Sequence, residues 1–345
     1  MRVQLAAKRC ALLLAAFGLL AHLCAISTTA HAATIVRFTL DRKIDGAAIP
    51  FVLATSRGLY RAENLEVTTN TVATASEAFA RLARGDSDIA LVDFNDLIRY
   101  RDNGTAPLKA VFILHNDNGY AIVARRSRGV DGVTDLQGKT LGVAEGDLSI
   151  RMWPAISRRI GFDASKVKLE KIGSAVREPM LSAGQIDAVS GMTFASALNL
   201  RDRGVPAADL VVIRFADFGD RSYGQALVVN PAFAAANPQA VTGFIRATIN
   251  GVRLALKDPV SAVDDLLAQM DGGSRELELE RVRAVLRDNI VTPEVRRDGI
   301  GGITPERFDA SVEQIAADFK FRNRPAQRDL FDDAFLPPAL SRKVD

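Results

Sequence analysis

A short pattern that occurs once in each half of the chain constrains its fold most strongly. Residues 82–88 (Leu-Ala-Arg-Gly-Asp-Ser-Asp) and 181–187 (Leu-Ser-Ala-Gly-Gln-Ile-Asp) both read Leu-x-x-Gly-x-x-Asp, and small apolar residues follow each of them. In such a pattern the glycine ends a helix in the left-handed conformation and the aspartate opens a buried strand. Its recurrence in the same helix–strand context predicts two similar α/β lobes.

Strand and helix signals alternate around both repeats. Thr74-x-x-Glu77 is a capping box, which predicts the start of a helix that stops at Gly85. Short apolar strands separated by helices are typical of a parallel sheet that is covered on both faces. The expected strands are Thr34–Leu40, Leu65–Val72, Asp88–Val92, Thr140–Ala144, Val167–Ile172 and Ile186–Ser190, and helices are expected at Ile49–Leu59 and Ile150–Ile160.

Two further strand-like runs, Tyr120–Ala124 and Tyr223–Val229, are expected to join the lobes as hinge strands. The chain after them is helical and begins with a long amphipathic helix, which Asn237 would cap and Pro238 would start. We therefore predict a discontinuous first lobe (33–125 and 226–345) and a second lobe (126–225). Such lobes form a clamshell that closes on a ligand at the carboxyl ends of the strands.

The N-terminus has the order of a secretory signal peptide. Basic residues come first, the apolar run Cys10–Ile26 follows, and Ala30-His31-Ala32 supplies a small-residue cleavage site. We expect residues 1–32 to be removed after Ala32 and the mature protein to be periplasmic. An uncleaved membrane anchor is the alternative.

Cleavage would change the composition that is available for function. The mature chain would have 41 basic and 41 acidic residues, no cysteine, and His115 as its single histidine. A neutral chain is a poor nucleic-acid binder, and it would lack the ligands for zinc or iron–sulfur sites and a cysteine nucleophile. We therefore expect no nucleic-acid partner, no metal and no cofactor, and no further segment that spans a membrane.

Polar residues follow several of the expected strands. The loop Ala144–Ser149 leaves a strand and opens a helix, so its free N–H groups could bind an anion or a carbonyl group, or Asp147 could simply cap that helix. The runs Asp93–Asp96 and His115–Asn118 could orient a ligand, or could serve as an N-cap and a turn. Thr193 would cap a helix, and Trp153 is more readily a core residue than a ligand-stacking one.

An ordered set of motifs spans nearly the whole mature chain. In these motifs the chain resembles the periplasmic solute-binding proteins of the nitrate/taurine/alkanesulfonate and thiamine-precursor group of ABC importers, the NitT/TauT (SsuA/ThiY-like) family. The resemblance implies a type II periplasmic-binding-protein clamshell, a small-molecule ligand, and an ABC permease with a cytoplasmic ATPase as partner; we expect a monomer. The motifs are Ile49–Ala54 with Arg57–Tyr60, Gly85–Ala90, Asp135–Val143, Leu181–Ala188 and Asn237-Pro238.

The resemblance also bears on the ligand. Thiamine-precursor binders are similar to one another at Asp-Trp-x-x-Asn with a nearby histidine, whereas this chain has Asp41-Arg42-Lys-Ile-Asp45 and Ala48. That departure disfavours a pyrimidine, and the acids and amides of the other loops favour a neutral or amine-bearing compound, including a heteroaromatic one, over sulfonate or nitrate. Arg42 or Arg151 pointing into the cleft would reverse this expectation.

We expect no enzymatic activity. The yeast pyrimidine-synthesising enzymes share the implied fold but look dependent on cysteine and histidine. A periplasmic ligand sensor, or a carboxylate-based enzyme that uses Asp93 and Asp147, are the alternatives to a transport component. The candidate ligand-binding residues are Asp41, Asp45, Asp93, Phe94, Asn95, Asn116, Asp117, Gly146, Asp147, Ser149, Met192, Thr193, Phe194, Asp217 and Tyr223.

Overall fold

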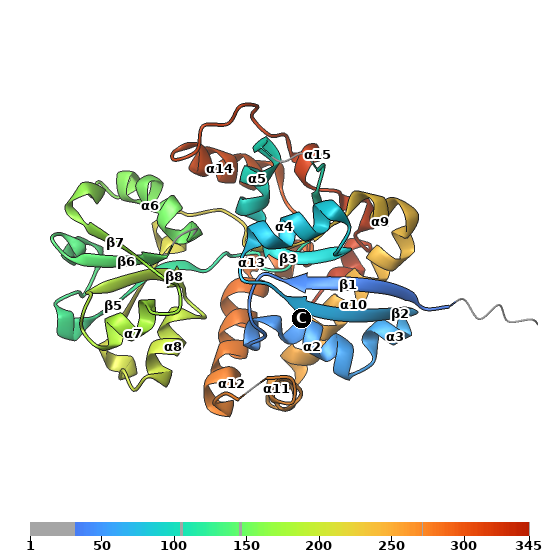
Figure 1. Ribbon diagram of the computed structural model, residues 1–345, viewed down its shortest axis with the longest axis horizontal. Coiled ribbons are helices and arrows are strands. Elements are labelled where there is room, and N and C mark those ends of the chain that lie inside the picture. Colours follow the sequence, from blue (N-terminus) through green and yellow to red (C-terminus); the bar gives the residue numbers. More distant parts are fainter. Residues whose placement is uncertain (1–31, 104–105, 145–146, 271, 345) are drawn as a thin grey trace, which may run out of the picture. The chain divides into compact units, whose positions relative to one another are not determined.

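The computed structural model describes residues 32–103, 106–144, 147–270 and 272–344, so the predicted signal peptide lies almost entirely outside the described residues. Residues Thr34–Asp345 form one compact unit. That unit contains two five-stranded sheets with helices around them (Figure 1). Across the described ranges, no helix is long and apolar enough to cross a membrane.

The first sheet has the order β2-β1-β3-β10-β4. Strand β1 pairs in parallel with β2 and β3, whereas β10 runs antiparallel between β3 and β4. All five residues of β3 and of β10 are buried, as the apolar sequences of these strands lead one to expect. The strands are β1 Thr34–Leu40, β2 Leu65–Thr71, β3 Ile89–Asp93, β4 Lys109–Ile113 and β10 Gln225–Val229.

The second sheet repeats this topology in the order β7-β6-β8-β5-β9. Strand β6 pairs in parallel with β7 and β8, and β5 runs antiparallel between β8 and β9. The two similar α/β units that the repeated pattern predicts are therefore present. The strands are β5 Tyr120–Arg125, β6 Thr140–Ala144, β7 Lys168–Ile172, β8 Ala188–Met192 and β9 Leu210–Arg214.

The sheets differ from the expectation in one respect. Each is mixed rather than parallel, because the two runs expected to be hinge strands are inner antiparallel strands. Strand β5 belongs to the second sheet, although the predicted boundary at residue 125 grouped it with the first. The sheets are joined by the segments 114–119 and 215–224, which we call the first and second connections.

The glycine and the aspartate of the repeated pattern have the same structural roles in both sheets. Gly85 and Gly184 have φ values of +77° and +73°, the left-handed conformation that ends each helix. The Asp88 carboxylate accepts a hydrogen bond from the backbone N–H of Arg37 on the adjacent strand (2.8 Å). The Asp187 carboxylate accepts the equivalent one from Thr140 (2.9 Å). Each aspartate thus fixes the start of its strand against the neighbouring parallel strand.

Helices flank both sheets, and several start and stop as the sequence predicts. Thr74 Oγ1 accepts a hydrogen bond from Glu77 N–H at the start of α4, whereas Asn237 makes no side-chain cap for α10. Gly58, at φ +70°, divides the expected helix 49–59 into α2 and α3. The helices used below are α2 Ile49–Ser56, α3 Leu59–Ala62, α4 Ala75–Arg84, α5 Phe94–Asn103, α6 Leu148–Arg159, α8 Ser196–Asp202, α10 Pro238–Lys257, α12 Arg275–Ala284 with a π-helical turn Val285–Ile290, α13 Pro293–Asp298 and α14 Pro305–Ala316.

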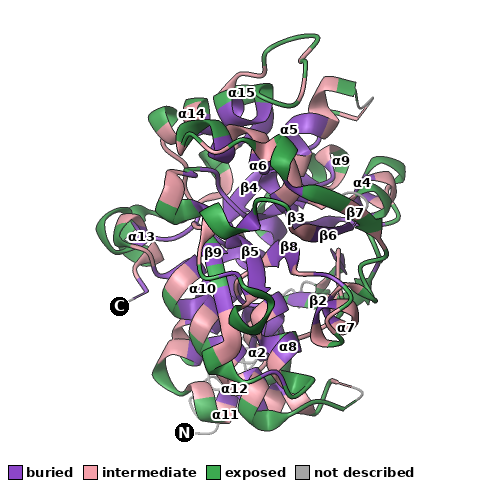
Figure 2. Ribbon diagram, turned by 90° about the vertical axis from the view of Figure 1, so that its left-hand side faces the viewer, coloured by how far each residue is buried: buried purple, intermediate pink, exposed green. Residues whose placement is uncertain are grey.

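The core follows the inner strands such as β3, β5 and β8, which are largely purple in Figure 2, whereas the edge strands β2 and β7 are mainly exposed or half-buried. Phe38 of β1 contacts Phe51 of α2 and Phe244 of α10, with ring centroids 4.7 and 5.0 Å away. Trp153 is 2% exposed and stacks on Phe215, so it is a core residue, as expected. These aromatic clusters anchor α2, α6 and α10 beside the sheets.

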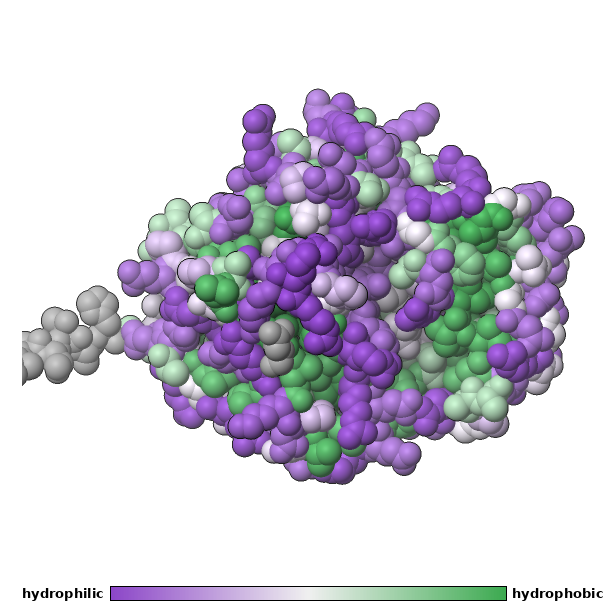
Figure 3. Space-filling model, turned by 180° about the vertical axis from the view of Figure 1, so that it is seen from behind, coloured by the Kyte–Doolittle hydropathy of each residue, from purple (hydrophilic) through white to green (hydrophobic). Residues whose placement is uncertain are grey.

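The outer surface is polar. Figure 3 shows one face, on which hydrophilic side chains predominate. Exposed ion pairs such as Arg57–Asp265 and Arg246–Glu63 tie separate segments together (2.6 and 2.5 Å). Exposed pairs of this kind each contribute about 0–1 kcal/mol, so stability rests on the core.

Candidate functional site

The carboxyl end of β3 carries a buried polar group. Asp93 is 2% exposed, and its carboxylate accepts hydrogen bonds from the Tyr120 hydroxyl (2.7 Å) and from the backbone and side-chain N–H groups of Asn95 (2.8 and 3.0 Å). Burial raises the pKa of Asp93 to about 6. Because Tyr120 begins β5, this contact joins the end of a first-sheet strand to the start of a second-sheet strand.

The end of β1 contributes a second link between the sheets. Asp41 accepts a hydrogen bond from Arg42 Nε (2.9 Å), and Arg42 NH1 lies 3.9 Å from the sulfur of Met192, which ends β8. The charge of Asp93 also acts on Arg42. Arg42 therefore lies among the strand ends of both sheets, where the carboxylate of Asp41 balances its charge, so it adds no unpaired positive charge for an anionic ligand.

His115 follows β4 at the start of the first connection and is 1% exposed. Neither of its ring nitrogens has a hydrogen-bond partner in the described part of the chain, and its ring meets Phe194 edge to face, with centroids 5.5 Å apart. Burial, with a smaller effect of the charge of Arg42, lowers the pKa of His115 to about 3. The imidazole is therefore neutral at physiological pH and offers one N–H donor and one nitrogen acceptor.

Three further residues that contact or adjoin the two connections have buried side-chain polar atoms with no hydrogen-bond partner among the described residues. These atoms are both side-chain polar atoms of Gln225, Oδ1 of Asn289 and Oδ1 of Asn95. The backbone carbonyl of Gln225 accepts a hydrogen bond from the backbone N–H of His115 (3.0 Å), and Gln225 pairs with Asp93 across the sheet. Asn289 Nδ2 donates to Asp117 O (3.0 Å). We call His115, Gln225, Asn289 and Asn95 the hinge floor. Buried polar atoms are rarely left unpaired in native proteins, so these atoms mark a candidate binding region.

The candidate residues of the second sheet are held by their neighbours. Asp147 caps α6 through Ser149 N–H (3.0 Å) and also accepts hydrogen bonds from Arg177 (2.7 Å) and from the Ser190 hydroxyl (2.5 Å). The Ser149 hydroxyl donates to the same carboxylate (2.7 Å). Gly146, the remaining candidate in this loop, lies outside the described residues. Asp147 therefore caps α6 with the help of Ser149, which is the alternative to ligand binding that the sequence left open.

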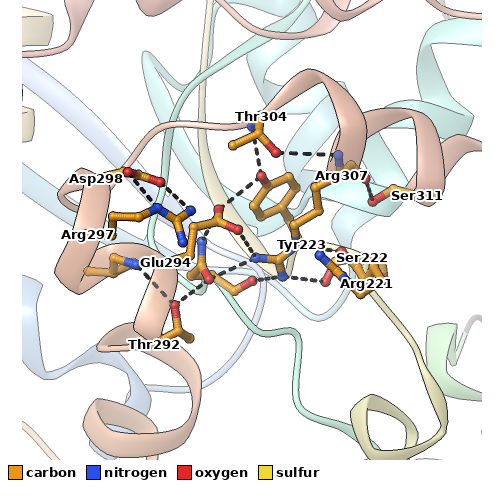
Figure 4. A network of polar contacts seen from close by, with 12 residues as sticks. Arg221, Ser222, Tyr223, Thr292, Glu294, Arg297, Asp298, Thr304, Arg307 and Ser311 are labelled. Atoms are coloured by element: carbon orange, nitrogen blue, oxygen red, sulfur yellow. Dashed lines mark hydrogen bonds and ion pairs between the residues drawn. The ribbon is translucent and has the colours of Figure 1, made fainter.

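The two connections meet in a polar network (Figure 4). Arg307 of α14 donates to Asn116 Oδ1 (2.8 Å) and Asn116 O in the first connection, and to Arg221 O (2.6 Å) in the second. The Tyr223 hydroxyl donates to Glu294 (3.2 Å) and accepts Thr304 N–H (2.9 Å). Beside this network lies a cavity of about 360 Å³ that Asn116 and Asp117 line. Asn116 and Tyr223 therefore form part of the hinge itself.

Other candidates have structural surroundings. Phe94 is fully buried against Tyr223 and Phe308. Phe194 is 1% exposed and belongs to the same hydrophobic core cluster as Phe38 and Phe244. Asp45 caps a short 3-10 turn through Ala47 N–H. Asp217 forms an exposed pair with Arg214 (2.6 Å), and Thr193 does not cap α8, which begins at Ser196 after Ala195. The structure therefore gathers Asp41, Asp93, Asn95 and Met192 at the strand ends, and places Asp217 away from them.

Three residues of the hinge floor were missing from the candidate residues. Gln225 had a detectable signal, because it is the one polar residue of an otherwise apolar buried strand. His115 was noted as the single mature histidine, but nothing local showed that it would be unpartnered. Asn289 comes from the π-helical turn far along the chain and carries no local signal. Within the described part of the chain, no group of His, Cys, Asp and Glu side chains could hold a metal ion.

The fold defines a class, and the comparisons with known proteins define a family. The two-sheet architecture is the periplasmic-binding-protein fold: the periplasmic aliphatic sulphonate binding protein SsuA from Escherichia coli superposes with a TM-score of 0.68 at 14% identity, over 86% of this chain and 91% of that one. Residues 46–262, more than half of the chain, match the family model described as NMT1/THI5 like. The chain belongs to the NMT1/THI5-like family, which agrees with the predicted relationship.

Two curated relatives are similar over most of the chain. The 4-amino-5-hydroxymethyl-2-methylpyrimidine phosphate synthase of Schizosaccharomyces pombe is 22% identical over 64% of this chain, which spans 65% of that protein's length. The riboflavin-binding protein RibY of Chloroflexus aurantiacus is 24% identical over 70% of this chain and 68% of its own length. The relatives thus include a binding protein and an enzyme.

Proposed function

We propose that this protein is the periplasmic solute-binding component of an ABC importer, which captures a small organic solute between its two sheets and presents it to a membrane permease with a cytoplasmic ATPase. The hinge floor is the observation that carries this proposal. The family, the fold and the signal-peptide pattern of residues 1–32 support it. The proposed lobes are the two sheets with their helices, joined by the two connections.

The hinge floor restricts the chemistry of the solute. Neutral His115 and the Gln225 amide offer N–H donors, whereas His115, Gln225, Asn289 and Asn95 all offer acceptors. A sulfonate or nitrate ion can only accept hydrogen bonds, so it would leave the acceptors unpaired, and each unpaired buried group costs about 1–3 kcal/mol. A ring or amide edge with both N–H and C=O groups would pair with both kinds of atom.

A solute of this class resembles the ligand named for RibY more than the ligand named for SsuA. RibY is named as a riboflavin-binding protein, and riboflavin is a ring system with both donors and acceptors, whereas SsuA is named for aliphatic sulphonates. We therefore propose a heteroaromatic or amide-bearing solute whose donor and acceptor edge, rather than an anionic group, meets the hinge floor. Asp41, Asp93 and Asn95 would flank it at the strand ends of the first sheet, and Met192 would flank it from the second.

Native mass spectrometry of the mature chain as purified tests this proposal. A bound small molecule, recovered and identified after denaturation, is the expected result. Added at about 100 times its Kd, that molecule should stabilise the protein by about 2.7 kcal/mol. Gln225→Met should weaken its binding, because this change keeps the side-chain volume and removes both polar atoms. If no molecule is recovered and a broad panel of heterocycles and amides gives no thermal stabilisation, the proposal fails.

A second candidate function is favoured by a pair of carboxyl groups and by the synthase among the relatives. Burial raises the pKa of Asp93 to about 6, and burial with the charge of Asp93 raises the pKa of Asp96 to about 7. Two acids with pKa values near neutrality are suited to general acid–base catalysis. Incubating the recovered solute with the protein and following it by NMR decides between binding and conversion, since a binding protein returns the solute unchanged.

A further inference from the structure

The side chain of Arg99, on α5, is buried without a hydrogen bond. It is 6% exposed, and none of its three guanidinium nitrogens has a hydrogen-bond partner among the described residues. The nearest carboxylate oxygen, Oδ2 of Asp318, lies 3.9 Å from NH2, and the Phe319 ring lies 6.0 Å from the guanidinium carbon. A buried guanidinium has five N–H groups to satisfy, and an unpaired buried charge is costly, so this position calls for an acceptor.

Arg151, on α6 beside the second sheet, is near enough for its charge to act on Arg99. It is half-buried, and its side chain makes no hydrogen bond or ion pair with any described residue. Burial, and then the positive charge of Arg151, lowers the pKa of Arg99. Helix α14 packs against both α5 and α6, so the two helices that carry these arginines meet at α14. Two like charges that repel each other across this junction would be stabilised by an anion between them.

The third charged group at this position is Asp96, one turn before Arg99 on α5. Its carboxyl group is half-buried and makes no hydrogen bond with a described residue. Since its pKa is raised to about 7, chiefly by burial, a large fraction of it is protonated at neutral pH. In that form it opposes an anion less and can donate its own hydrogen bond.

Guanidinium groups suit one kind of anion in particular. Their planar fork of N–H donors matches the geometry of two oxygen atoms on one centre, as in carboxylate, phosphate or sulfonate groups. We propose that Arg99 and Arg151 form an oxyanion subsite at the junction of α5, α6 and α14. The oxyanion is either a free ion or a substituent of the solute, and in the second case the inference rests on the proposed function.

Inorganic phosphate is the first probe, at constant ionic strength with sodium chloride as the balancing salt. At about ten times its Kd, phosphate should raise the Tm of the wild-type protein by a few degrees, and chloride should not. Arg99→Met and Arg151→Met should each abolish most of that rise. Arg246→Met is the matched control, since Arg246 is an exposed arginine paired with Glu63, and it should keep the full response.

The unliganded variants supply a second readout. Arg99→Met removes an unpaired buried charge and should unfold at the same or a higher temperature than the wild type without phosphate, whereas a purely structural ion pair with Asp318 would make it less stable. Arg151→Met alters a half-buried side chain and keeps the test valid if Arg99→Met does not fold. A phosphate response that is absent from the wild type, or that is equal in all variants, overturns the subsite.

A pair of ring compounds separates the two sources of the oxyanion. Uracil and orotate share one ring, and orotate adds a carboxylate. If the oxyanion is a substituent of the solute, orotate should bind to the wild type more tightly than uracil does. The two compounds should bind to Arg99→Met with equal affinity. If it is a free ion, phosphate should stabilise the protein and the two ring compounds should behave alike. Failure of the solute proposal leaves the phosphate response unaffected, so the two can be told apart.

Discussion

The guanidinium of Arg307 lies over the ring of Tyr223, with its carbon 4.1 Å from the ring centroid. From that position it donates hydrogen bonds to backbone oxygens of both connections, Asn116 O in the first and Arg221 O in the second. One side chain from the C-terminal helix α14 therefore joins the two segments that link the sheets. Any rotation of one sheet against the other must either preserve or break these hydrogen bonds.

Replacing Arg307 by alanine should loosen the hinge. Its side chain is 11% exposed and pairs with Glu294 (3.2 Å), and breaking a buried pair of this kind costs about 3–5 kcal/mol. Backbone amides of residues 114–119 and 219–224 should exchange faster with deuterium in the variant. Arg297→Ala, which removes an exposed arginine paired with Asp298, is the control. Unchanged exchange in both connections would show that Arg307 does not restrain the hinge.

Asp93 should make the wild type lose stability relative to Asp93→Asn as the pH rises from about 4 to about 6, while buried His115, whose pKa is lowered to about 3, acts in the opposite direction in both proteins. Asp93 has a pKa of about 6 in the folded protein, against 3.8 as its ordinary value, so the folded state binds more protons in this window. Stability decreases with pH wherever the folded state holds the extra proton, by about 3 kcal/mol for a shift of this size. Urea unfolding of wild type and Asp93→Asn at several pH values measures the effect. Asparagine cannot ionise, so the unfolding free energy of Asp93→Asn should increase relative to that of the wild type as the pH rises; parallel curves would rule out a contribution of Asp93.

Gly251→Ala should destabilise the protein. Gly251 lies where α10 crosses α2, and a methyl group added there would come within 2.2 Å of Pro50 O. Overpacking of this kind typically costs about 1–3 kcal/mol. Chemical denaturation measures the loss, and Gly161→Ala serves as the comparison for an open position, with allowance for its left-handed backbone. An equal or smaller loss at Gly251 would mean that α10 can move away from α2.

His115→Phe should separate stability from binding. The imidazole contributes two unpaired buried nitrogens, and a phenyl ring can pack against Phe194 in their place. Removing an unpaired polar group from a core can be neutral or stabilising by about 1 kcal/mol. The variant should therefore unfold at the same or a higher temperature while it binds the recovered solute more weakly. A variant that is clearly less stable would indicate that His115 is satisfied within the folded protein.

Much of the fold could be predicted from the sequence because its signals are local. The limits of β1 and β6 match the expected strands, and Gly85 and Gly184 end their helices as predicted. The directions of β5 and β10 could not be predicted, because an apolar run shows that a strand is buried but not which neighbours it pairs with. Asn237 shows a similar limit: its side chain donates to Phe233 O instead of capping α10.

The site was less predictable than the fold. Strand ends identified Asp93 and Asn95, because the carboxyl ends of parallel strands meet at one edge, whereas the family resemblance identified Asp41. The distinguishing property of His115 and Gln225 is that their side-chain polar atoms have no hydrogen-bond partner among the described residues. This property depends on every residue that surrounds them. Local reasoning therefore selected Asp217, whose carboxylate is paired on the surface, and passed over Gln225.

The Kd of the recovered solute for three proteins tests the central claim most directly. We predict that Gln225→Met weakens binding at least about tenfold relative to the wild type, which corresponds to about 1.4 kcal/mol, because both polar atoms of Gln225 are lost. Asp217→Asn, a change at a sequence-predicted but exposed residue, should bind like the wild type. Wild-type affinity in Gln225→Met, or a loss of affinity in Asp217→Asn, would contradict the assignment of the hinge floor as the binding site.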